Sequence, residues 1–221
     1  MHRTLLAFLL LFALAVGLTA ADPASSANDK PAATPPLAGM TIPEYDPQGK
    51  LFRPTGYERW VVVGTSIGLS YSDGEKKDPD NPGMFHNVYM QPQAFDHFVQ
   101  TGEFPEQTIF VVTNNPSQPT KGKDELNRHG FFASPSTGLE VAVKDSRRFE
   151  DTWAYYMYHD KPTEKNTAKS GQKRDAEPAF PRADCHECHL EHGEIDNVFT
   201  QFYSVLTAAR SRHLADSTPQ P

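Results

Sequence analysis

The chain has 221 residues, and its 21 basic and 28 acidic side chains give a net charge of −7 at neutral pH. This acidic balance argues against nucleic acid and against an anionic membrane surface as partners. It is compatible with electrostatic docking to a basic redox partner.

The first 21 residues have the pattern of a secretory signal peptide. Arg3 supplies a positive charge, an apolar run covers residues 5–18, and small residues at 19–21 allow cleavage. The apolar run is shorter than the ~20 residues that a spanning helix needs. We therefore expect a periplasmic protein with no membrane span after cleavage. Residues 22–41, rich in Ala and Pro, are expected to be a flexible linker, residues 42–213 one folded domain, and residues 214–221 a disordered tail.

Strands dominate the predicted secondary structure of the domain. Segments rich in β-branched and aromatic residues are expected as strands at residues 58–65, 85–90, 108–113, 129–133, 138–144 and 153–158. Turn residues separate them, including the run Asn114-Asn115-Pro116. A short helix is expected over residues 93–100, and the polar residues 161–182 are expected as a long loop. Apolar residues at helical spacing predict a last helix over residues 188–212.

Residues 185–189 read Cys-His-Glu-Cys-His and contain both cysteines of the chain. The C-x-x-C-H pattern is typical of c-type haem attachment. Two thiols one helical turn apart form thioethers with the haem vinyl groups, and the adjacent imidazole ligates the iron. We predict one covalently attached haem c, with Cys185 and Cys188 as the thioether residues and His189 as the axial metal ligand. Export agrees with this prediction, because the haem is attached outside the bacterial inner membrane.

Two other uses of the motif stay open. A zinc site would take the same residues and add His186 and His192, but such sites usually draw their second pair of ligands from a distant segment. The chain has no further cysteine to supply one. A redox-active pair or a disulfide is less favoured, since the surrounding pattern does not predict a thioredoxin-like unit.

Several further segments occur in a characteristic order around the motif. They are DPQGKL (46–51), YERWVVVGT (57–65), VYM (88–90), TGEF (101–104), GLEVAVKDS (138–146), WAYY (153–156) and VFTQFYSVL (198–206). Together they make the chain resemble the cytochrome P460 / cytochrome c′-β family. The resemblance implies a mainly β, α+β fold, in which an antiparallel sheet is followed by the C-x-x-C-H site and a C-terminal helix. It also implies an open haem face opposite the axial histidine, and a homodimer.

The family contains two kinds of haem protein. Cytochromes P460 oxidise hydroxylamine and carry a lysine cross-linked to the haem, whereas cytochromes c′-β bind nitric oxide at a five-coordinate haem capped by phenylalanines. Counting from the TGEF segment, the cross-linking position falls on Val112, and a valine cannot form that bond. Lys121 and Lys123 would replace it only after a shift of register. The chain is therefore more similar to cytochrome c′-β.

The resemblance also suggests which residues line the open haem face. If Val112 faces the haem, Phe110 lies on the same side of its strand and would cap the iron, unless it is ordinary core packing. His86, at the position of an arginine in some cytochromes P460, would donate a hydrogen bond to a ligand, coordinate iron, or simply be solvated. Glu140 interrupts an apolar strand, so we expect it to be solvated, to pair with an arginine (Arg147 or Arg148), or to relay protons.

Three functions follow from these expectations. The favoured one is binding of nitric oxide, or a related nitrogen oxide, at a five-coordinate haem. The second is enzymatic oxidation of hydroxylamine, with His86 and Glu140 as catalytic candidates. The third is electron transfer as a c-type cytochrome, with His86 or a methionine as a sixth ligand.

Overall fold

The computed structural model describes residues 35–70, 78, 80–120, 130–160 and 175–217, which lie within one compact unit, Ala33–Pro221. The predicted signal peptide, most of the predicted linker and most of the predicted 161–182 loop lie outside the described residues. So do Lys121 and Lys123. Within the described parts, no helix combines the length and apolar character needed to cross a membrane.

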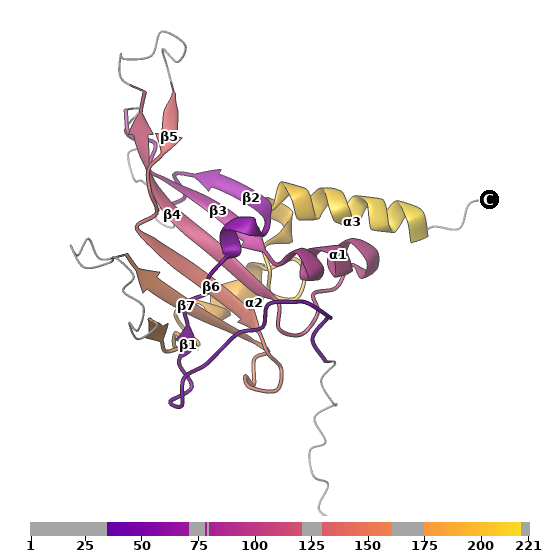
Figure 1. Ribbon diagram of the computed structural model, residues 1–221. Helices are drawn as coiled ribbons and strands as arrows, with labels where there is room; N and C mark the ends of the chain where they lie inside the picture. The colour runs from indigo at the N-terminus through magenta and orange to yellow at the C-terminus, as the bar shows by residue number, and fades with distance from the viewer. Residues whose placement is uncertain (1–34, 71–77, 79, 121–129, 161–174, 218–221) are drawn as a thin grey trace, which may run out of the picture. The chain divides into compact units, whose positions relative to one another are not determined.

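An antiparallel sheet forms the centre of the fold (Figure 1). Its strands, in spatial order, are β2 (Val61–Ile67), β3 (Met84–Met90), β4 (Ile109–Pro119), β6 (Gly138–Lys144) and β7 (Trp153–His159), and β5 (Phe131–Ala133) pairs with the far end of β4. Two short strands, β1 (Leu51–Phe52) and β8 (Ala176–Glu177), form a separate pair. The mainly β, α+β fold class is confirmed.

Strand alternation divides the side chains of the sheet between two apolar clusters. One cluster contains Phe110, Trp153 and Tyr155, and the partly buried Val112 and Cys185 pack against it. The other contains Ile109, Val111, Leu139, Val141, Val143, Tyr156 and Tyr158. Odd and even positions of β4 therefore face opposite sides, as a period of two requires. The motif cysteine lies on the same side as Phe110 and Val112.

Helix α1 (Pro92–Thr101) confirms the helix predicted over residues 93–100. Proline near its first position suits a helix start, and Gly102 ends it in the left-handed conformation with φ 75°. Before it, Gln91 is fully buried. Its amide donates to the carbonyls of Thr41 and Gln107, at 3.0 and 2.9 Å, and accepts from the backbone N–H of Ile109 at 2.6 Å. This side chain joins three segments at the start of β4.

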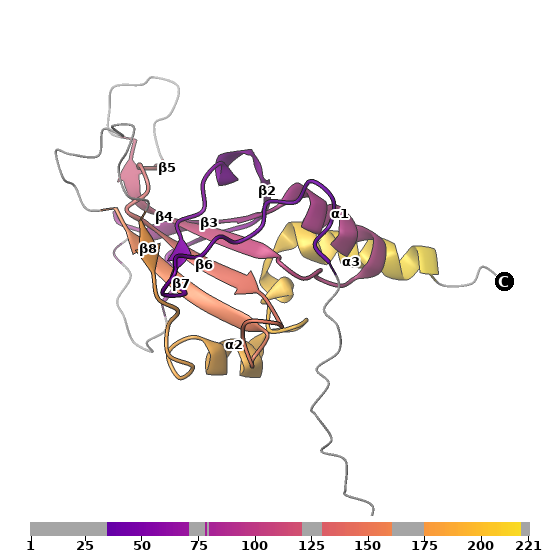
Figure 2. The ribbon, with the colours of Figure 1, turned by 60° about the horizontal axis from the view of Figure 1, so that its bottom comes forward.

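The prediction of a single long helix over residues 188–212 is wrong. The structure has α2 (His186–His192), the 3₁₀ helix η2 (Thr200–Phe202) and α3 (Ser204–Ser217), separated by non-helical residues. Between α2 and η2, Asp196 and Asn197 have φ values of 49° and 60°. Two consecutive left-handed residues form a tight turn and cannot continue a right-handed helix. In Figure 2, α2 lies beneath β6 and β7, while α3 runs beside α1 at the other end of the sheet.

Two boundaries in the sheet also differ from prediction. Asn114, Asn115 and Pro116 do not form a turn, because β4 continues through them to Pro119 and pairs with β3. Ladder hydrogen bonds outweigh local turn preference here. At the other end of the sheet, residues 57–59 form a 3₁₀ helix, η1 (Tyr57–Arg59), so β2 begins only at Val61.

Candidate functional site

The two cysteines lie one helical turn apart at the start of α2. Cys185 immediately precedes the helix and is half-buried, and Cys188 lies within it and is exposed. The backbone N–H of His189 donates to the carbonyl of Cys185 at 3.1 Å, which closes the first turn. Both cysteines are free thiols. This local geometry places two thiols and an imidazole in the order that C-x-x-C-H haem attachment requires.

His189 is held by two aromatic rings and one hydrogen bond. The rings of Tyr155 and Phe199 each have their centroid 4.4 Å from that of the imidazole. Nδ1 lies 2.9 Å from the carbonyl oxygen of Asn197, so it carries the proton and donates it, because a carbonyl can only accept. Burial lowers the pKa of His189. The neutral ring therefore keeps an unprotonated Nε2, the atom that coordinates a metal.

The buried polar atoms of this region fit a haem. Trp153 Nε1, Tyr155 Oη and Nδ1 of both His86 and His186 are buried without a hydrogen-bond partner. Such atoms are uncommon in folded proteins and call for a partner. A haem has two propionate groups that accept hydrogen bonds, and its porphyrin suits the apolar residues that pack near Cys185. The donor set and its surroundings therefore match the group that the motif implies.

Phe110 and Val112 lie on the sheet face that Cys185 contacts. Phe110 is 4% exposed, and its ring contacts Phe104 and Tyr203 at centroid distances of 5.4 and 6.4 Å. Val112 is only partly buried and packs against the same cluster. Contacts with two aromatic rings thus hold Phe110 in place, while Val112 remains partly accessible.

Glu140 lies beside Val112, its direct partner across the β4–β6 ladder. Its carboxylate accepts a hydrogen bond from Asn114 Nδ2 at 3.1 Å. Burial, followed by the Glu140 charge, raises the pKa of the Cys185 thiol. The suggested pairing with Arg148 is not what the structure shows. That guanidinium lies over the ring of Tyr45 instead, 3.7 Å from its centroid.

Asn114 is a residue of this site that the sequence analysis missed. It lies directly opposite His86 in the β3–β4 ladder and donates to Glu140 from the other side. Its Oδ1 and the Nδ1 of His86 are both buried without a partner. The structure thus brings together the two predicted polar residues through Asn114. Phe110 and Val112 face the same side of β4, and the next residue in this alternation is Asn114. The sequence analysis missed Asn114 because it ended the strand at residue 113.

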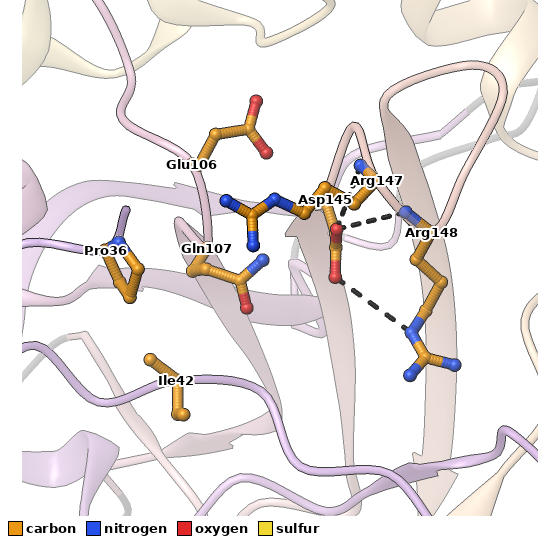
Figure 3. A pocket seen from close by; sticks show the side chains of 7 residues that line it. All are labelled: Pro36, Ile42, Glu106, Gln107, Asp145, Arg147 and Arg148. Atoms are coloured by element: carbon orange, nitrogen blue, oxygen red, sulfur yellow. Dashed lines mark hydrogen bonds and ion pairs between the residues drawn. The ribbon is translucent and has the colours of Figure 1, made fainter. Parts of the chain in front are cut away.

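Two cavities among the described residues differ in their lining. One, of about 520 Å³, is lined by Pro36, Ile42, Glu106, Gln107, Asp145, Arg147 and Arg148 (Figure 3). Its buried Asp145 accepts from the backbone N–H groups of Arg147 and Arg148, so it stabilises a turn. A smaller one, of about 220 Å³, borders Trp153, Tyr155 and His186 beside α2. Trp153 and Tyr155 belong to the cluster that contains Phe110, so the smaller cavity borders the candidate site, whereas the larger one is lined by no residue of that cluster or of the motif.

Comparison with known proteins agrees with the site geometry. The family model described as Cytochrome P460 matches residues 54–200, more than half of the chain, and this range includes the sheet and the whole C-x-x-C-H motif. No curated protein sequence matches the chain. The chain therefore belongs to the cytochrome P460 family, and this membership implies a c-type haem as its cofactor.

Proposed function

We propose that this protein is a periplasmic haem protein that binds nitric oxide, or a related small nitrogen oxide, at an open iron position. One haem c would be attached through Cys185 and Cys188, with His189 as its axial ligand. The observation that carries the proposal is the state of His189, whose Nδ1 proton is donated to a backbone carbonyl at 2.9 Å. Its ring lies between two aromatic side chains, one turn from two free thiols.

The residues near Val112 support ligand binding over a permanent sixth ligand. Val112 takes the place that the family resemblance gives to the cross-linking lysine, and a valine leaves the porphyrin unmodified. Phe110 is locked in an aromatic cluster on the same face and would keep bulk water away from a ligand. When bound, the haem supplies an iron centre with affinity for nitrogen oxides. The protein's part is to hold the haem, to enclose the ligand and to orient it at the iron.

Tyr155 would contribute a neutral hydroxyl to this enclosure. Burial raises its pKa, so the phenol stays protonated over the physiological range. Its ring packs against His189, and its Oη is buried without a partner. The phenol therefore supports the imidazole from the side and keeps a donor for a haem substituent.

Hydroxylamine oxidation is a second candidate, because one observation favours it. That reaction needs a proton acceptor near the substrate, and Glu140 offers a half-buried carboxylate on the relevant face, held by Asn114. An ordered general base contributes about 10²–10⁴-fold to a rate. Electron transfer, the third candidate, would require a sixth ligand such as His86.

Location and partners complete the proposal. The signal peptide predicted over residues 1–21 would direct the chain to the periplasm. There, a basic redox protein is the partner that the net negative charge of the chain suits, and the resemblance suggests a homodimer. Neither nucleic acid nor a membrane span belongs to the proposal.

Covalent attachment can be tested directly. The full chain is expressed with its signal peptide in a bacterium that matures cytochromes c, and haem is extracted with acidic acetone. We expect haem to remain with the protein, and to be lost in the double variant Cys185→Ala/Cys188→Ala. The exposed His192 at the end of the same helix provides a control, since His192→Ala should retain haem. Zinc in place of haem in the wild-type protein would contradict the proposal.

Glu140→Gln separates the first two functions. If the protein is an enzyme, this variant should lose hydroxylamine-dependent reduction of an electron acceptor by about 10²-fold or more, while Glu103→Gln, on the α1–β4 loop, should not. If the protein only binds nitric oxide, the wild type itself should show no such turnover. Nitric oxide binding by both variants would then resemble that of the wild type.

A further inference from the structure

The carbonyl that accepts the His189 proton belongs to a tight turn. Ile195 and Val198 form a bridge, with Val198 N–H donating to the carbonyl of Ile195 at 2.8 Å. Asp196 and Asn197 occupy the two central positions, both with positive φ. Asp and Asn adopt this conformation more readily than other residues with a side chain. The turn thereby points the carbonyl of Asn197 toward the imidazole.

Gly193 allows this turn to pack directly against the end of α2. A Cβ at Gly193 would lie 2.5 Å from the carbonyl carbon of Asn197 and 2.6 Å from the carbonyl oxygen of His189. Real Cβ atoms do not approach other atoms so closely. The backbone of residue 197 is therefore seated against the helix end at a distance that only glycine permits.

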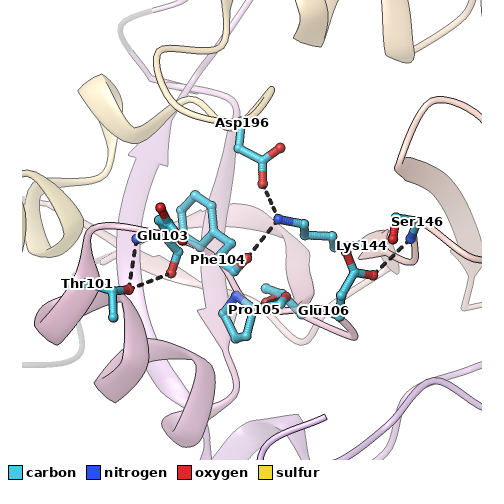
Figure 4. A network of polar contacts seen from close by, with 9 residues as sticks. Thr101, Glu103, Phe104, Pro105, Glu106, Lys144, Ser146 and Asp196 are labelled. Carbon is cyan, nitrogen blue, oxygen red and sulfur yellow. Dashed lines mark hydrogen bonds and ion pairs between the residues drawn. The ribbon is translucent and has the colours of Figure 1, made fainter. Parts of the chain in front are cut away.

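Lys144 fixes the turn from the opposite side. It is the last residue of β6, and its Nζ lies 2.7 Å from Asp196 Oδ2 and 2.8 Å from the carbonyl oxygen of Phe104 (Figure 4). Its side chain is 15% exposed and that of Asp196 is 31% exposed. The Lys144 ammonium is largely buried and has two oxygen partners. Its position is therefore more tightly fixed than that of an ammonium in an exposed ion pair.

The anchor of Lys144 is itself well ordered. The segment after α1 is fixed by Thr101, whose Oγ1 accepts from the N–H of Glu103 at 3.1 Å. It is joined to the end of β6 by Glu106, whose carboxylate accepts from the N–H of Ser146 at 2.9 Å (Figure 4). Lys144 therefore reaches the turn from a rigid part of the sheet and not from a loose loop.

We propose that Lys144 is a positioning residue for the axial histidine. Through Asp196 it fixes the turn whose Asn197 carbonyl accepts the Nδ1 proton of His189. A strong hydrogen bond at Nδ1 makes an imidazole a more basic ligand and sets its orientation. The ion pair thus controls how strongly His189 donates electron density to iron. This inference rests on the proposed attachment of haem at the motif.

The test compares holoprotein variants by spectroscopy. In Lys144→Met and in Asp196→Asn, the Nδ1 hydrogen bond should weaken. The iron–histidine stretching band of the ferrous protein should then move to lower frequency, and the midpoint potential should move in the positive direction. Lys144→Arg, which keeps a cation, should lie closer to the wild type. Arg53→Met breaks an ion pair of similar exposure, 2.7 Å from Arg53 to Asp160, that does not contact the turn. It should leave band and potential unchanged.

Three results would overturn the inference. A band and a potential that stay unchanged in both Lys144→Met and Asp196→Asn would do so while leaving the proposed function intact. The same holds if Arg53→Met shifts them equally, since the effect would then reflect general destabilisation. A wild-type protein without covalent haem would instead overturn the proposed function, and the inference with it. Asp196→Asn keeps a hydrogen-bonding side chain, so it provides a folded variant even if Lys144→Met expresses poorly.

Discussion

Gly193→Ala should both destabilise the protein and disturb the axial histidine. The new Cβ would lie 2.5 Å from the carbonyl carbon of Asn197, 2.7 Å from its Cα and 2.6 Å from the carbonyl oxygen of His189. All three are backbone atoms, so no side chain can rotate away. The φ of Gly193 is −68°, which alanine adopts without strain, and the cost is therefore steric. Inserting a methyl group into a packed region costs about 1–3 kcal/mol.

This cost can be measured as a change in melting temperature. For a domain of this size each 1 kcal/mol corresponds to about 2–4 °C, so thermal unfolding of the holoprotein followed by circular dichroism should shift down by about 2–12 °C. The iron–histidine band should move as well, because the turn that carries the Asn197 carbonyl is displaced. Glu191→Ala is the control, since that side chain is 76% exposed on the same helix. An unchanged melting temperature together with an unchanged band would refute the packing that we describe.

Three further changes have defined outcomes. Gln91→Leu should lower the free energy of unfolding by about 2–4 kcal/mol in a denaturant titration, because it removes the three hydrogen bonds that this buried side chain makes to backbone atoms. Asn114→Leu should reduce any hydroxylamine turnover while leaving nitric oxide affinity unchanged in optical titrations, since Glu140 loses its donor. The Thr200 hydroxyl and a nearby guanidinium lower the pKa of Glu194, so its stabilising contribution is present at neutral pH and is lost as the pH falls through that lowered pKa. Melting curves at successively lower pH should show this loss in the wild type and less of it in Glu194→Gln.

Features encoded by neighbouring residues could be predicted from the sequence. The strand at residues 138–144 was expected with the bounds that β6 has, because the apolar residues Leu139, Val141 and Val143 recur there with a period of two. Helix α1 differs by one residue at each end. The haem motif needs only the spacing of five consecutive residues, since one helical turn places both thiols and the imidazole. The division of β4 into two faces follows from its period of two.

Two features of the site were not predicted from the sequence: the break in the last helix and the ion pair between Lys144 and Asp196. The apolar residues from Ile195 to Leu206 have helical spacing, yet Gly193 and the Asp196-Asn197 pair break the helix to place a carbonyl at His189. Those turn-forming residues were a signal against one continuous helix. The ion pair between Lys144 and Asp196 joins residues 52 positions apart, and no local pattern encodes it.

Optical spectra of the purified protein, ferric and ferrous, with and without nitric oxide, test the central claim most directly. An unmodified c-type haem with His189 as its axial protein ligand should give a high-spin spectrum whose Soret band shifts when nitric oxide is added. A strongly red-shifted ferrous Soret band would contradict the placement of Val112, because it would indicate a cross-linked macrocycle. A low-spin spectrum that nitric oxide leaves unchanged would contradict the open iron position and favour electron transfer.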